Sequence, residues 1–126
     1  MAMPAAKAQH QQPFLGQILS EMRDLLDSNY LRLDFCVKVN NIANKIFEKQ
    51  GLPDSYSPTQ LVLQERCRVF YHWLDWAEKT LPREDQQEHQ KFSMLKMRIV
   101  NTWAQQRNVR ISWKLQGEGS YQFSFS

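Results

Sequence analysis

The side chains with the types and spacing closest to catalytic chemistry are His72 and Asp75, which lie three residues apart. On a helix this spacing places both on one face, where a carboxylate could orient an imidazole for proton transfer. Cys67, a potential nucleophile, is five residues from His72 and falls on a different face. His89 follows Glu88 in a polar stretch typical of a helix surface. These patterns favour solvated surface over a catalytic site.

Motifs for metal or cofactor binding are missing from the sequence. Cys36 and Cys67 stand alone, and the three histidines are scattered, without CxxC or HExxH spacing. Gly117 and Gly119 fall in a predicted hairpin turn and not between a strand and a helix, as a phosphate-binding loop requires. We therefore expect no catalytic residue, no cofactor and no metal, and two reduced thiols in a cytoplasmic protein. No apolar run approaches the roughly 20 residues of a membrane span, so no membrane partner is expected.

Positive charge is concentrated in the last third of the chain. Residues 1–82 contain nine Lys or Arg and nine Asp or Glu, whereas residues 83–126 contain seven and four, which accounts for the net charge of +3. Residues 91–116 include no acid and six cations, namely Lys91, Lys96, Arg98, Arg107, Arg110 and Lys114. Cations and small polar groups on a helix and a hairpin suit contact with the phosphates of RNA or DNA, without reading of the bases.

The element that must organise the fold is a long helix predicted over residues 57–81. Ser57 is the expected N-cap, followed by a proline at the first helical position. The apolar residues after it occupy two adjoining stripes, which together cover more of the helix than a surface helix normally buries. We therefore expect this helix to lie at the centre of the core, with Phe70 and Trp73 buried.

Three further segments complete the predicted helical core. Residues 13–29 and 84–106 have the helical spacing of apolar residues, and Pro13 is expected to open the first helix after a flexible tail of residues 1–12. Residues 31–39 alternate between apolar and polar side chains as a strand would, yet a helical stripe also runs through them to residue 50 without a turn signal. This continuity favours a helix.

The last eighteen residues, 109–126, change to a period of two, which predicts a β-hairpin. Folding at Glu118 would place every apolar residue on one face and would pair Leu115 with Tyr121, Trp113 with Phe123, and Ile111 with Phe125. A lone hairpin is marginal in water, so this face must pack on the helices or on a partner.

Together these patterns predict a mainly α fold, with a four-helix bundle-like core and a C-terminal hairpin in a single domain of residues 13–126. The alternatives are an α+β fold with residues 31–39 as a strand, and a winged-helix-like fold. For function we expect a non-catalytic protein that binds nucleic-acid backbone as a small subunit of a nucleoprotein assembly with other protein subunits. The alternative is a protein–protein adaptor or inhibitor module that uses surplus aromatic residues and the unpaired hairpin edge.

Overall fold

The fold was determined from a computed structural model, which describes residues 5–27, 31–52, 59–117 and 121–125. Within these segments the chain forms four helices and a two-stranded antiparallel sheet, in the order α1 (Ala5–Asp27), α2 (Arg32–Lys49), α3 (Gln60–Glu78), α4 (Gln86–Gln105), β1 (Ile111–Leu115) and β2 (Tyr121–Phe125). The predicted fold, a helical core followed by a C-terminal hairpin, is confirmed. None of the helices in the described segments combines the length and apolar content needed to cross a membrane.

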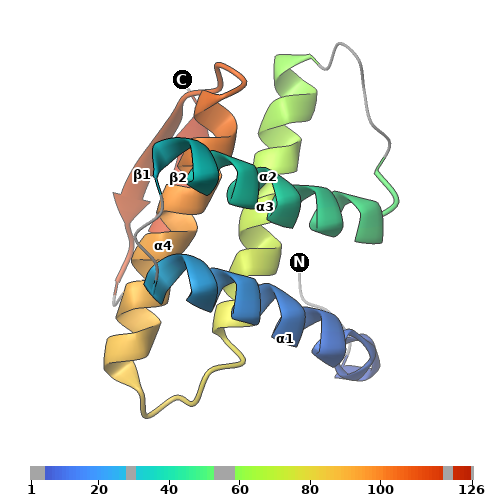
Figure 1. The fold of residues 1–126 in the computed structure, drawn as a ribbon, viewed down its shortest axis with the longest axis vertical. Coiled ribbons are helices and arrows are strands. Elements are labelled where there is room, and N and C mark those ends of the chain that lie inside the picture. Colours follow the sequence, from blue (N-terminus) through green and yellow to red (C-terminus); the bar gives the residue numbers. More distant parts are fainter. Residues whose placement is uncertain (1–4, 28–30, 53–58, 118–120, 126) are drawn as a thin grey trace.

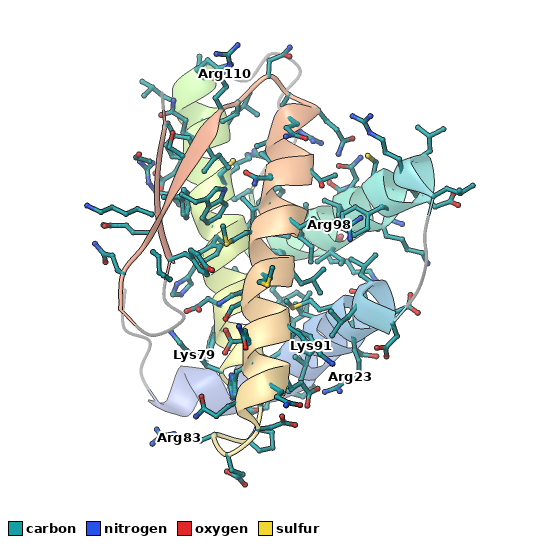
Figure 2. The ribbon with its side chains drawn as sticks, turned by 90° about the vertical axis from the view of Figure 1, so that its left-hand side faces the viewer. Arg23, Lys79, Arg83, Lys91, Arg98 and Arg110 are labelled. Carbon is teal, nitrogen blue, oxygen red and sulfur yellow. The ribbon has the colours of Figure 1, made fainter. Side chains whose placement is uncertain are left out.

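The helices α3 and α4 form the middle of the molecule. They run side by side, and α1 and α2 lie across them (Figure 1). Seen after a 90° turn, α2 and most of α1 lie on one side of α4, and the hairpin lies on the other (Figure 2). The middle pair is therefore covered from two sides, as the two apolar stripes of α3 require.

The centre of the core is aromatic. Phe70 and Trp73 of α3 are buried, as predicted, at 0% and 1% exposure. Phe70 meets Phe47 of α2 and Trp103 of α4 edge-on, with ring centroids 6.1 and 6.4 Å away, and Phe47 and Trp103 are 5.5 Å apart. This edge-to-face arrangement suits the charge distribution of aromatic rings, and here it joins three helices at one point.

The ambiguous segment of residues 31–39 is helical from Arg32 onward, after Leu31 as the N-cap residue, and the alternative strand is wrong. Phe35 and Val39 of α2 are buried on the inner side of the helix. Leu33 and Val37 are 79% and 56% exposed on its outer side. The strand-like alternation arose because these two apolar residues lie on the solvent face of a helix.

The start of α1 differs from the expectation. The helix begins at Ala5, so residues 5–12, expected in a flexible tail, are helical. Their sequence is rich in alanine and glutamine, which have high helix propensity. Pro13 lies inside the helix, where it removes one backbone hydrogen bond and disturbs the preceding turn. In Figure 1 the first turns of α1 are turned away from the axis of the remainder. Residues 1–4 lie outside the described residues.

The start of α3 also differs. Its N-cap is Thr59, whose extended backbone and side-chain oxygen, accepting from the Val62 amide at 3.3 Å, have the geometry of a cap. The expected cap, Ser57, lies outside the described residues. The expected start there is wrong because the first helical residue is Gln60.

The hairpin has the predicted register. Leu115 pairs with Tyr121, Trp113 with Phe123, and Ile111 with Phe125. Its apolar face packs on the helices, where Tyr71 of α3 has its ring centroid 5.4 Å from Trp113 and 5.3 Å from Phe123. Trp113 Nε1 also donates to Asn101 Oδ1 of α4 at 2.8 Å. The hairpin is thus fastened to both middle helices, and its polar face points outward.

Candidate nucleic-acid interface

The helix α4 carries three of the predicted phosphate-contacting cations. An α-helix turns by about 100° per residue, so Lys91 and Arg98, seven residues apart, share a face. Lys96 is two residues from Arg98 and lies on nearly the opposite side of the helix. The three cations therefore meet different neighbours.

Lys96 faces α3 and is buried, with 2% of its surface exposed. Its Nζ donates to Asp75 Oδ1 and to Glu78 Oε1, both at 2.7 Å. Burial by itself would lower the pKa of Lys96, but the hydrogen bonds to these two carboxylates raise it above the ordinary value. The charge of Lys96, predicted to contact nucleic acid, is thus enclosed and already paired with two carboxylates.

His89 and Ser93 extend this buried cluster along α4. Ser93 Oγ donates to Glu78 Oε1 at 3.2 Å. His89 Nδ1 is 2.6 Å from Glu78 Oε2, and its Nε2 is 3.0 Å from the Pro82 carbonyl oxygen. A carbonyl oxygen and an ionised carboxylate can only accept, so this geometry favours the imidazole that carries a proton on both ring nitrogens. The hydrogen bond to Glu78 accordingly raises the pKa of His89.

The carboxylates of the cluster are held in their ionised form. Burial would raise the pKa of Glu78, but hydrogen bonds from Lys96, His89 and Ser93 lower it below the ordinary value. The same balance between burial and hydrogen bonds from Lys79 and Lys96 lowers the pKa of Asp75. Sequence reasoning missed this cluster. Its signal is the polar line His89, Ser93 and Lys96 on α4, at helical spacing of four and three residues.

Arg107 is half-buried at the end of α4. Its Nη1 donates to the Trp103 carbonyl oxygen at 2.9 Å and to Asn40 Oδ1 of α2 at 3.4 Å, and its guanidinium carbon lies 4.1 Å from the centre of the Trp103 ring. These contacts tie the end of α4 to α2. Arg107 therefore takes part in packing, and its Nη1 is already engaged within the fold.

The four remaining predicted residues are exposed, but they form two groups. Lys91 and Arg98 lie on the side of α4 nearer to α1 and α2, whereas Arg110 lies beyond the end of α4, at the start of the hairpin (Figure 2). Lys114 lies on the polar face of β1, which points away from the helices. Among the described residues none of these four side chains forms an ion pair. Lys91 is partly compensated, since its charge, after hydrogen bonds with Glu88, also lowers the pKa of Asp85.

A groove between α2 and α4 adds a cation that the sequence analysis did not consider. The groove has a volume of about 570 Å³ and is lined by Arg32, Phe35, Cys36, Arg98, Thr102, Gln105 and Gln106. The two arginines come from positions 66 residues apart, and no carboxylate lines the groove. Arg32 sits in the neutral part of the chain, so charge counting along the sequence contained no signal for it. We call this feature the α2–α4 groove.

Two other grooves differ in charge. One, of about 410 Å³, lies between α1 and α2 and mixes acids with bases, with Glu21, Asp24, Lys38, Lys45 and Glu48 among its lining residues. The other, of about 280 Å³, lies between α3 and β2 and includes His72 and Asp75. In that groove Asp75 accepts hydrogen bonds from Lys79 and Lys96, each at 2.7 Å. Its carboxylate is therefore held by lysines.

Within the described residues no three His, Cys, Asp or Glu side chains gather closely enough to hold a metal ion. No protein-family model, no curated protein and no solved structure matches the chain. The function must therefore be argued from the surface itself.

Proposed function

We propose that this protein is a non-catalytic binding protein that contacts the sugar–phosphate backbone of RNA or DNA, without reading its sequence. The observation that carries the proposal is the set of exposed cations that form no ion pair among the described residues, Arg32, Lys91, Arg98, Arg110 and Lys114. Exposed cations attract a polyanion and release its condensed counterions on binding. In the proposed interface, Arg32 takes the place of the buried Lys96.

The proposal includes a role as a small subunit of a nucleoprotein assembly in the cytoplasm. Cys36 and Cys67 are both free, which suits a reducing compartment. Leu33 and Val37 form an exposed apolar pair on α2, a surface that another protein subunit could cover.

The alternative is a protein–protein adaptor or inhibitor, and the exposed pair Leu33 and Val37 is the observation that favours it. The aromatic residues support this alternative less strongly than the sequence implied. Every aromatic side chain whose burial is described is at least half-buried, including Trp76 and Trp113. The aromatic surplus is thus used largely in the core and beneath the hairpin.

Salt dependence tests the proposed function. Binding of a fluorescent oligonucleotide of about 20 nucleotides should weaken steeply between about 50 and 200 mM salt, because each phosphate contact releases counterions. Lys114→Gln should reduce the slope of log affinity against log salt by about 0.7–0.9. Arg83→Gln is the matched control, because Arg83 is exposed in the loop before α4, at the opposite end of the molecule from Arg110 (Figure 2).

Two results would contradict the proposal. One is a wild-type protein that does not bind the oligonucleotide even at about 50 mM salt. The other is an equal loss of slope in Lys114→Gln and Arg83→Gln, which would show a response to net charge with no defined interface.

A further inference from the structure

We propose that the α2–α4 groove is a binding site for one phosphodiester group of a nucleic-acid backbone, with Arg98 and Arg32 as its cationic ligands. This inference rests on the proposed function and adds a defined position at which one backbone phosphate is held. The hairpin cations Arg110 and Lys114 would then act mainly through their charge.

Arg98 is held in position by an aromatic ring. Its guanidinium carbon lies 4.0 Å from the centre of the Phe35 ring of α2, and Phe35 is itself buried. A guanidinium stacked on a ring keeps its N–H groups pointing outward in its own plane, where they can donate two parallel hydrogen bonds to phosphate oxygens. Because the ring limits the motion of the side chain, less conformational entropy is lost on binding.

Arg32 brings a second positive charge to the same groove. It belongs to the first turn of α2, and it forms no ion pair among the described residues. A phosphodiester carries one negative charge, so two arginines in a groove whose lining includes no carboxylate more than balance it. The mixed groove between α1 and α2 lacks this property, since three carboxylates line it.

The rest of the lining is polar without being acidic. The side-chain amide of Gln105 is exposed at the rim and can donate to a phosphate oxygen. Gln106 is engaged with Asn40 of α2, donating to its Oδ1 at 3.3 Å and accepting from its Nδ2 at 2.9 Å. This amide pair links α2 to the end of α4 at the groove. It therefore helps to fix the relative position of the two helices that carry Arg32 and Arg98. The groove is also larger than one phosphate needs, which leaves room for the attached sugars.

The test uses substitutions that keep the charge. Arg98→Lys preserves the positive charge but removes the planar fork that makes two parallel hydrogen bonds, whereas Arg110→Lys is the same change on the hairpin. We expect Arg98→Lys to weaken binding of the oligonucleotide about tenfold at constant salt, and Arg110→Lys to change it less than about twofold. Both variants should keep the wild-type melting temperature within about 2 °C, because neither side chain is buried.

A spectroscopic measurement locates the phosphate independently of affinity. In side-chain NMR spectra of the arginine Nε–H groups, the oligonucleotide should shift the signals of Arg32 and Arg98 strongly and that of Arg110 weakly. A peptide nucleic acid of the same length, which has no phosphates, should shift none of them.

The outcomes separate the inference from the proposed function. If the wild-type protein binds but both Arg→Lys variants bind equally well, the groove site is wrong and the general electrostatic interface stands. If inorganic phosphate shifts Arg98 but the oligonucleotide does not, the groove takes a free phosphate and the inference is wrong. If the wild-type protein does not bind the oligonucleotide at all, the proposed function itself fails.

Discussion

Lys96 and Arg98 are two residues apart on α4 and carry the same charge, but they have opposite environments. Lys96 points at α3 and lies between two carboxylates, with 2% of its surface exposed. Arg98 points toward α2, stacks on Phe35 and lines an open groove without acids. The charge of Lys96 is neutralised by ion pairs inside the fold, whereas the charge of Arg98 is available to a ligand.

This contrast shows that the role of a charged residue on a helix depends on which side chains of the neighbouring helix it faces. Asp75 and Glu78 are 21 and 18 residues from Lys96 in the sequence, and nothing between them marks the pairing. A buried ion pair of this kind is not in itself a strong stabiliser, since desolvation opposes the attraction. Breaking it, however, removes the buried cation that both carboxylates share, so the two cations should respond very differently to substitution.

The largest expected effect is on Lys96. Lys96→Met keeps the apolar stem but removes the cation that Glu78 and Asp75 share, which leaves Glu78 with His89 and Asp75 with the exposed Lys79. It should lower the free energy of unfolding by about 3–5 kcal/mol. Urea denaturation monitored by tryptophan fluorescence measures this. A loss below about 1 kcal/mol would mean that Lys96 is solvated, as the sequence alone suggested.

The pH dependence of stability has the next largest expected effect, because the Lys96 cluster combines two carboxylates of lowered pKa with a histidine of raised pKa. The pKa values of Glu78 and Asp75 are lowered from 4.5 and 3.8, so their contribution is present above those values and is lost as pH falls through the folded values. The pKa of His89 is raised from 6.5, so its contribution is complete below 6.5 and is lost as pH rises through the folded value.

The measurement is the unfolding free energy of the wild type and of His89→Gln, across the acidic and neutral range. Burial lowers the pKa of His72, so His72 changes the pH dependence of stability in the opposite direction to His89. Because His72 is present in both the wild type and His89→Gln, the difference between their unfolding free energies isolates the contribution of His89. We expect the stabilising difference at low pH to disappear above the folded pKa of His89. A difference that is constant with pH would show that His89 does not titrate against Glu78.

Arg107 should give an intermediate effect, because it is half-buried and bonded to Asn40 and to the Trp103 carbonyl. Arg107→Met retains most of the packing on Trp103 and removes the hydrogen bonds, so we expect a loss of about 1–2 kcal/mol. The affinity of Arg107→Met for the oligonucleotide should fall only by the small amount expected from the loss of one distant positive charge. A loss of binding as large as that of Arg98→Lys would place Arg107 in the interface after all.

The smallest effect on stability is expected for Arg98. Arg98→Met removes only an exposed stack on Phe35, so the unfolding free energy should change by less than about 1 kcal/mol, while oligonucleotide binding falls. Urea denaturation and anisotropy titration of the same sample test both statements. A stability loss comparable to that of Lys96→Met would remove the distinction between the two cations.

The local pattern of apolar residues in the sequence was sufficient to predict much of the fold. The period of two in residues 109–126, with the turn between its halves, was sufficient to specify the hairpin and its register, because strand partners there are close in sequence. The apolar stripes around Phe70 and Trp73 likewise required α3 to be covered on several sides. Helix starts were less predictable, since Thr59 and Ser57 are both chemically suitable caps and Pro13 suits both the beginning and the interior of a bent helix.

Tertiary structure alone decided which charges are free. The sequence placed six cations in one segment, but their neighbours come from α2 and α3, which lie outside it. Packing brought Asp75 and Glu78 to Lys96 and Asn40 to Arg107, and it brought Arg32 to Arg98 from 66 residues away. The physical reason is that helical periodicity is set by neighbours within a few turns, whereas electrostatic pairing depends on the distance between side chains on different helices.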